Sequence, residues 1–128
     1  MTHEIIETNE APAAIGPYSQ AIRAASFLYT SGQIALCPST GVMLGVDDVA
    51  AQAEQAIANL FAVIRAAGLR PDHIVKTTIF LVEMSHFTEV NAIYSAAMGD
   101  HRPARSTVAV SALPKGALIE IEAVCSAG

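Results

Sequence analysis

Residues 49–67 read VAAQAEQAIANLFAVIRAA, and residues 74–82 read IVKTTIFLV. In the first stretch apolar residues recur at intervals of three and four, which predicts an amphipathic helix with Gln52 and Asn59 on its other faces. The second stretch is a β-branched run with the length of a strand. Together the two stretches predict a helix that packs against a sheet through its apolar side.

The ends of the first helix are also marked in the sequence. Asp47 and Asp48 supply a side-chain acceptor and negative charge where the helix begins. Arg65 places a positive charge in the last turn, and Gly68 can take the left-handed conformation that ends a helix.

A second helix is expected over residues 86–98, where side chains repeat at helical spacing and Ser85 is placed to cap the first turn. Two further strands are expected at residues 106–110 and 118–124. The turn-forming residues 113–116, LPKG, join these strands.

Near the start of the chain, residues 19–24 and 27–34 are expected to form a hairpin, although Ala25-Ser26 is a weak turn signal. The order of elements is then β-β-β-α-β-α-β-β, an α+β fold. Strand-helix-strand units predict parallel pairing with right-handed crossovers, so both helices should cover one face of a mixed sheet. No helix remains for the other face, which we expect to pack against neighbouring subunits.

The length and composition set limits on function. At 128 residues the chain suits one domain, residues 1–128. It is 52% apolar and 15% charged, which favours burial of surface between subunits. The formal net charge is −5 and the basic residues form no run, so nucleic acid is not expected as a partner.

Membrane and metal functions are not expected either. No apolar stretch approaches the roughly 20 residues that cross a bilayer, and the N-terminus lacks the features of an export signal. Cys37 and Cys125 lie far apart and are expected to be reduced thiols, which fits the cytoplasm. The four histidines share no metal-ligand spacing.

Charged residues interrupt the two C-terminal strands. Side chains alternate across a strand, so Arg105 and Thr107 share one face, and Glu120 and Glu122 share one face. The short connection at Pro114 permits these strands to be antiparallel neighbours, which would bring Arg105 and Glu120 to one pocket. A structural ion pair or a solvated edge strand explains the same pattern, and the pattern alone leaves these readings open.

Several short motifs follow one another along nearly the whole chain. They are AIGPYSQ at 14–20, TSGQI at 30–34, VKTT at 75–78, VNAIY at 90–94, and the C-terminal group RSTV at 105–108, LPK at 113–115 and IEIEA at 119–123. In this order and spacing the sequence resembles the RidA/YjgF family. The resemblance implies a chorismate-mutase-like fold and a homotrimer with an active site in each of three clefts between subunits.

The resemblance also implies an enzymatic reaction without a metal or organic cofactor. Members hydrolyse 2-aminoacrylate and 2-aminocrotonate, and their tautomers 2-iminopropanoate and 2-iminobutanoate, to 2-keto acids and ammonia. In this chain the catalytic residues would be Arg105 and Glu120. The planar guanidinium of Arg105 would bind the substrate carboxylate, and Glu120 would position or activate water.

Further substrate-binding residues follow from the same resemblance. Tyr18 would close the pocket, Ser31 and Gly32 would offer contacts at a strand end, and Asn91 would reach in from the second helix. Packing, turn formation and an interface hydrogen bond are the respective structural alternatives. Many members have Cys where this chain has Thr107, so a thiol contribution is absent here, while the backbone N–H at that position can still bind carboxylate.

Two other functions remain open at this point. A non-catalytic chaperone-like or ligand-binding member of the family would depend on apolar surface rather than on Arg105. A deaminase dedicated to one pathway would act on a larger imine or enamine acid.

Overall fold

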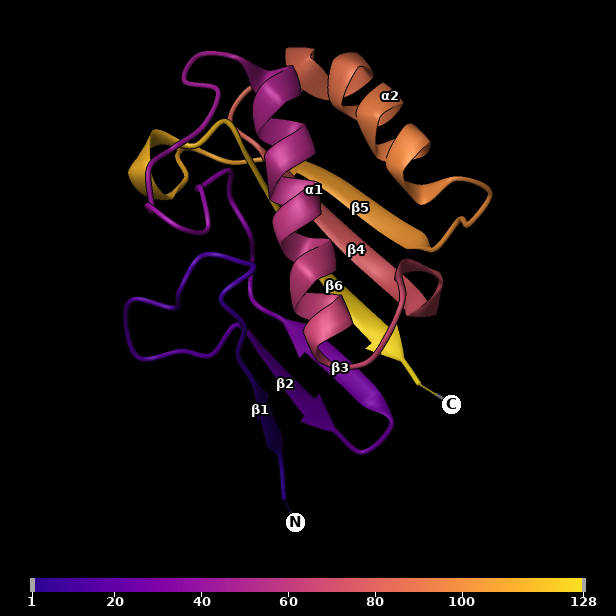
Figure 1. Cartoon of the computed structure of the whole chain (residues 1–128). Coiled ribbons are helices and arrows are strands. Elements are labelled where there is room, and N and C mark those ends of the chain that lie inside the picture. The colour runs from indigo at the N-terminus through magenta and orange to yellow at the C-terminus, as the bar shows by residue number, and fades with distance from the viewer. Residues whose placement is uncertain (1, 128) are drawn as a thin grey trace.

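The computed structural model describes residues 2–127 as a six-stranded sheet with two α-helices lying across it (Figure 1). The order β-β-β-α-β-α-β-β is the one that the sequence predicts. The strands are β1 (Glu4–Ile6), β2 (Ala21–Ala24), β3 (Phe27–Thr30), β4 (Ile74–Leu81), β5 (Ala104–Ala109) and β6 (Ile119–Ser126). The helices are α1 (Val49–Ala66) and α2 (Phe87–Met98), and short 3₁₀ turns occur at Pro71–His73, Met84–His86 and Pro114–Gly116.

The strands are arranged in the order β1-β2-β3-β6-β4-β5. β4 and β5 are parallel, as a strand-helix-strand unit requires, and the other pairs are antiparallel. The expectation that β5 and β6 are neighbours is wrong, because β4 lies between them. Ile79 pairs with Thr107 on one side and with Ile121 on the other. After β5, the chain crosses the end of β4 and then forms β6, which pairs with β4 on the side opposite β5.

Both helices lie on the same face of the sheet (Figure 1). α1 packs on β3, β6 and α2, and the core between the layers is formed by buried side chains such as Leu60, Ile79 and Ile121. On the opposite face Phe27 and Tyr29 flank the buried Leu28 and are 40% and 49% exposed. That exposed apolar face remains a predicted subunit interface.

The ends of α1 follow the sequence signals. Asp48 is the N-cap residue, and its Oδ1 accepts a hydrogen bond from the Ala51 N–H at 3.1 Å. Gly68 follows the helix with φ of 79°, in the left-handed region. Ser85, in contrast, does not cap α2. It lies inside the 3₁₀ turn Met84–His86, and α2 begins after it without a side-chain cap.

Two polar residues of α1 that were expected on its other faces are buried. Gln52 and Asn59 are each 1% exposed. Asn59 Nδ2 donates to the carbonyl oxygens of Ile34 at 3.0 Å and Leu36 at 2.9 Å. The segment before α1 has little regular structure, so its buried carbonyl groups need side-chain donors. Asn59 thereby fixes the backbone on which part of the site is built.

The hairpin of β2 and β3 turns at Ala25-Ser26, with φ of 54° at Ala25. The second strand was expected to continue to residue 34 but ends at Thr30. There the Thr30 Oγ1 accepts a hydrogen bond from the Ala123 N–H at 3.0 Å. This side-chain oxygen takes the place of a main-chain carbonyl as the acceptor for β6. Pairing with β6 resumes at Gln33, whose N–H donates to the Ile121 carbonyl at 2.8 Å. The interruption at residues 31–32 leaves a gap beside β6.

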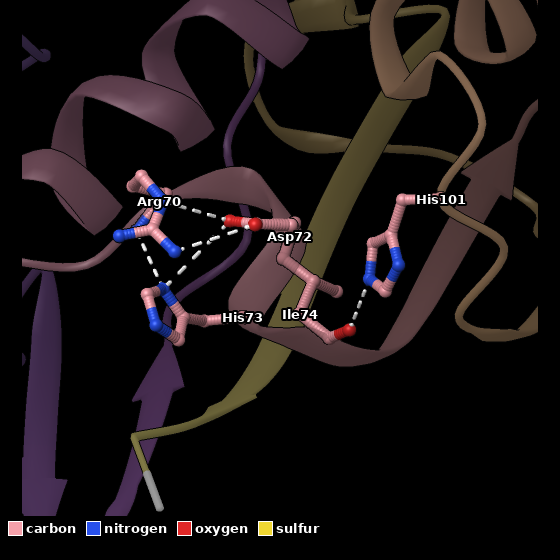
Figure 2. A network of polar contacts seen from close by, with 5 residues as sticks. All are labelled: Arg70, Asp72, His73, Ile74 and His101. Carbon is pink, nitrogen blue, oxygen red and sulfur yellow. Dashed lines mark hydrogen bonds and ion pairs between the residues drawn. The ribbon is translucent and has the colours of Figure 1, made fainter.

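A polar network holds the start of β4 (Figure 2). The Arg70 N–H donates to His73 Nδ1 at 2.9 Å, and Arg70 Nε pairs with Asp72 Oδ1 at 3.1 Å. His101 Nε2 donates to the Ile74 carbonyl at 2.7 Å. These two histidines therefore have structural partners.

Asn59→Ala should lower the free energy of unfolding by about 2–4 kcal/mol, because it leaves one buried and one partly buried carbonyl group without this donor. Urea unfolding at matched protein concentration would measure the change. Glu54→Ala, an exposed change on the same helix, is the control and should stay within about 0.5 kcal/mol of the parent. Equal unfolding midpoints for the two variants would contradict the role given to Asn59.

Candidate active site

Glu120 lies in an open pocket of about 570 Å³ at the gap beside β6. The pocket is built from the loop before β2, the segment after β3, the turn before β6, and β6 itself. The polar part of its lining consists of Tyr18, Ser31, Gln33, Lys115 and Glu120, and Gly32 lies among them. Four of the predicted site residues are thus brought together.

Gly32 is required by the close approach of Glu120. A Cβ atom at position 32 would lie 2.6 Å from Glu120 Cδ and 2.9 Å from its Cγ. Carbon atoms do not approach so closely, so any side chain here would displace the carboxylate. The interrupted pairing of β3 with β6 and the missing side chain together make room for Glu120.

Ser31 and Tyr18 contribute to the pocket in different ways. The Ser31 Oγ donates to the Ser19 carbonyl at 2.6 Å, and its N–H donates to the Gln20 carbonyl at 2.9 Å. Ser31 thus ties the two sides of the pocket together. Tyr18 follows a turn in which its N–H bonds to the Gly16 carbonyl at 2.9 Å. Its side chain is 55% exposed and stands at the pocket opening.

The environment of Glu120 changes its acidity. Burial raises the pKa of the Glu120 carboxyl above its ordinary value, and the nearby negative charge of Glu122 raises this pKa further. Glu122 is two residues along β6, on the same face. A carboxylate with a raised pKa is a stronger proton acceptor than an ordinary glutamate.

Arg105 lies at a second site, against α2. Its Nη1 donates to Asn91 Oδ1 at 2.8 Å. Its guanidinium carbon lies 5.0 Å from the ring centroid of Tyr94 and 5.6 Å from that of Phe87. A cavity of about 340 Å³ borders this group and is lined by Asn91, Tyr94, Ser95, Arg102, Pro103 and Arg105.

The expectation that Arg105 and Glu120 share one pocket of a single chain is wrong. Arg105 pairs with Thr77, whose buried hydroxyl hydrogen-bonds to Tyr94 of α2. The side chains of Thr77 and Arg105 therefore both lie on the helix-side face of the sheet. Glu120 pairs with Phe80, three positions from Thr77 and therefore on the opposite face of β4. The sheet itself separates the two charged groups within one protomer.

Thr107 shares the helix-side face with Arg105, since it pairs with the buried Ile79. Its Oγ1 is buried and has no hydrogen-bond partner in the part of the chain that the structure describes. β5 ends the sheet order, and Val110 after it donates its N–H to the Leu81 carbonyl at 2.8 Å. Backbone groups alternate in direction, so the N–H groups of Thr107 and Arg105 face the free edge.

The sequence did not single out Phe87, Tyr94 or Lys115 as site residues. Phe87, Asn91 and Tyr94 are spaced at i, i+4 and i+7 on α2, which places them on one helix face. That spacing was visible as an apolar repeat, but the cation that it contacts comes from a different element. Lys115 lies in a left-handed turn with φ of 57° and lines the Glu120 pocket.

Residues 2–127 contain no group of three or more His, Cys, Asp or Glu side chains placed to hold a metal ion. Neither of the described helices has the length and hydropathy needed to span a membrane. Both cysteines are free thiols.

Comparisons with known proteins agree with this fold. A sequence model of the family described as Endoribonuclease L-PSP matches residues 8–127. The chain belongs to this family, which is the RidA/YjgF family that its motifs resemble.

Individual relatives match over nearly their whole length. A 2-iminobutanoate/2-iminopropanoate deaminase of Salmonella typhimurium is 48% identical over 93% of this chain and 94% of that protein. A RutC family protein of Synechocystis is 50% identical over 97% of this chain and 96% of its own. The crystal structure of the Escherichia coli YjgF gene product has a TM-score of 0.91 and 47% identity, covering 96% of this chain and 98% of its own.

Glu122→Gln should lower the pKa of Glu120 toward its ordinary value, because one of the two causes of the raised pKa is removed. The shift can be measured by NMR titration of the Glu120 side-chain carboxyl carbon. Glu54→Gln removes the same charge from α1, on the other side of the sheet, and should leave that titration in place. An unchanged Glu120 titration in Glu122→Gln would contradict the assigned cause.

Proposed function

We propose that this protein hydrolyses 2-iminopropanoate and 2-iminobutanoate, with their enamine tautomers 2-aminoacrylate and 2-aminocrotonate, to 2-keto acids and ammonia. The observation that carries the proposal is the state of Arg105. Its guanidinium is held by Asn91 and two aromatic rings next to a cavity, with no carboxylate partner among the described residues. A guanidinium in this setting is suited to bind the carboxylate of a small acid.

The proposal includes a homotrimer in which each active site is made by two subunits. Arg105 with Asn91 and Thr107 would form one half-site, and Glu120 with Tyr18, Ser31 and Gly32 would form the other. Because the sheet separates the halves in one protomer, Arg105 of one subunit would face the neighbouring subunit's Glu120. The uncovered apolar face around Phe27, Tyr29 and Val108 supplies surface for that contact.

In this arrangement two groups would bind the substrate carboxylate. The remaining N–H groups of Arg105 would form a planar pair of hydrogen bonds with it. The Thr107 N–H, which faces the free edge of β5, would add a third donor. Asn91 would hold Arg105 through its amide oxygen, and its amide N–H groups remain available for the substrate. Binding the carboxylate would fix the position of the imine carbon.

Glu120 would then direct water onto that carbon. The water oxygen attacks the C=N carbon while the Glu120 carboxylate accepts a proton from that water, and Glu120 then passes this proton to the nitrogen. The tetrahedral intermediate releases ammonia as its hydroxyl forms the new C=O bond, so that imine and water give keto acid and ammonia. The raised pKa of Glu120 makes its carboxylate a better acceptor for the proton of the water. No cofactor takes part in the proposed reaction, and the free thiols favour a cytoplasmic protein.

The names of relatives and the site chemistry favour this reaction over the alternatives. The family description names a ribonuclease, but the chain has a net charge of −5, and Lys115 is the one basic residue among the described residues that line the Glu120 pocket. The same pocket is also lined by Ile15, Ile34 and Leu36, so imino acids with longer apolar side chains are a second substrate class to compare.

Threonine dehydratase acting on threonine would supply the imine, and semicarbazide trapping would report its lifetime. Addition of the protein should shorten that lifetime. Arg105→Lys should lower kcat/KM about 10- to 100-fold, because an ammonium group keeps the charge and loses the planar pair of donors. Unaltered imine loss with the parent protein would reject the proposed reaction, and near-parental turnover by Arg105→Lys would reject carboxylate binding by the guanidinium.

A mixing experiment would test the shared site. Arg105→Ala and Glu120→Ala should each be nearly inactive alone. Trimers assembled from an equal mixture of the two should regain about a quarter of parental activity, since half the interfaces supply an intact Arg105 and half of those an intact Glu120. A mixture that stays inactive, with trimers shown by sedimentation, would place both groups in one protomer's site.

A further inference from the structure

The core beneath Arg105 contains an isolated polar pair. Thr77 and Tyr94 are 1% and 7% exposed, and their hydroxyl groups are 2.8 Å apart in a buried hydrogen bond. Valine and phenylalanine would fill the same volumes without polar atoms. Buried hydroxyl groups contribute little net stability even when they are paired, so packing alone does not account for this choice.

The pair lies directly beside Arg105. Thr77 and Arg105 are paired in the parallel register of β4 and β5, so their side chains stand next to each other on the helix-side face. Tyr94 reaches down from α2 to Thr77, and its ring centroid lies 5.0 Å from the Arg105 guanidinium carbon. This distance is within the range of a cation–π interaction.

The contacts of Arg105 also define which of its donors are engaged. Asn91, one turn before Tyr94 on α2, accepts a hydrogen bond from Nη1. Tyr94 and Phe87 contact the guanidinium through their rings and leave its remaining N–H groups free of protein acceptors within the described residues. A tyrosine ring bonded to the sheet at its far end cannot shift without breaking that bond.

We propose that Tyr94 is a positioning residue for Arg105: its ring, secured by the hydrogen bond to Thr77, holds the guanidinium in the orientation that binds the substrate carboxylate. This inference rests on the proposed function, since it requires Arg105 to be the carboxylate-binding group. A flexible arginine loses side-chain freedom when it binds a ligand, and a guanidinium that is already fixed loses less. Tyr94 therefore acts on substrate binding rather than on the chemical step.

The test compares two double variants that both remove the hydroxyl pair. Thr77→Val with Tyr94→Phe keeps the ring, and Thr77→Val with Tyr94→Met fills the space with a flexible side chain and removes the ring. Neither leaves a buried hydroxyl without a partner. Met98→Ala, a core change elsewhere on α2, controls for a general loss of stability. Urea unfolding would confirm that each variant is folded.

The variant without the ring, T77V/Y94M, should raise KM for the imine and Kd for 2-oxobutanoate about tenfold, with kcat changed less than about twofold. T77V/Y94F should restore part of that affinity, because it keeps the ring but loses the hydrogen bond that secures it. Calorimetric binding of 2-oxobutanamide, which lacks the carboxylate, should be equal in the two variants. If T77V/Y94M and T77V/Y94F have the same KM and Kd, or if Met98→Ala raises both as much, the positioning role is overturned.

An activity-independent readout separates this inference from the proposed function. The ring of Tyr94 should shift the NMR signal of the Arg105 Nε–H group, and the shift should persist in T77V/Y94F and disappear in T77V/Y94M. An identical Arg105 signal in both variants would overturn the inference, whatever the reaction. A parent protein that neither binds 2-oxobutanoate nor accelerates imine loss would instead defeat the proposed function.

Discussion

Alternate side chains of a β-strand point to opposite faces of the sheet, and this constraint organises the whole site. β4 has β5 on one side and β6 on the other, in a register that places Arg105 beside Thr77 and Glu120 beside Phe80. A shift of one residue in either pairing would move one charged group to the other face. The fixed register therefore places the Arg105 guanidinium on one face of each protomer's sheet and the Glu120 carboxylate on the other.

Polar side chains inside the core hold these two surfaces in place. Asn59 reaches from α1 to the carbonyl groups of Ile34 and Leu36, and so fixes the segment that borders Glu120. Tyr94 reaches from α2 to Thr77 and contacts Arg105. In both cases a helix on the covered face of the sheet determines the position of a functional segment. Fully paired polar groups of this kind favour one specific arrangement of a core.

Sequence periodicity was sufficient to predict the order of elements and the position of α1, and the residue type of Asp48 was sufficient to predict the N-cap. Periodicity failed where the structure depends on contacts between residues that are far apart in the sequence. Gln52 and Asn59 were expected away from the core, because the backbone groups that pair with them, at Leu118 and Ile34, lie far along the chain. Short loops suggested that β5 and β6 are neighbours, whereas the β4-α2-β5 unit places β5 against β4. The early end of β3 at Thr30 depends on a side-chain hydrogen bond that no propensity encodes.

Motifs found the charged groups of the site, but not the contacts that hold them. Arg105, Glu120, Tyr18, Ser31, Gly32 and Asn91 each line one of the two cavities described above. The aromatic contacts of Arg105 were missed, since Phe87 and Tyr94 look like ordinary core positions of an amphipathic helix. The contact of these two rings with Arg105 is known only from the three-dimensional position of α2 over β5.

The outer edge of β5 makes the isolated chain prone to aggregation. Backbone groups at the end of a sheet are a template for any extended polypeptide, and such an edge promotes aggregation unless it is covered or charged. In the proposed site, the Thr107 N–H at this edge is one of the donors to the substrate carboxylate. A subunit released from the proposed homotrimer would therefore expose an edge that can pair with other chains, so assembly would protect the chain from misassociation as well as complete the proposed site.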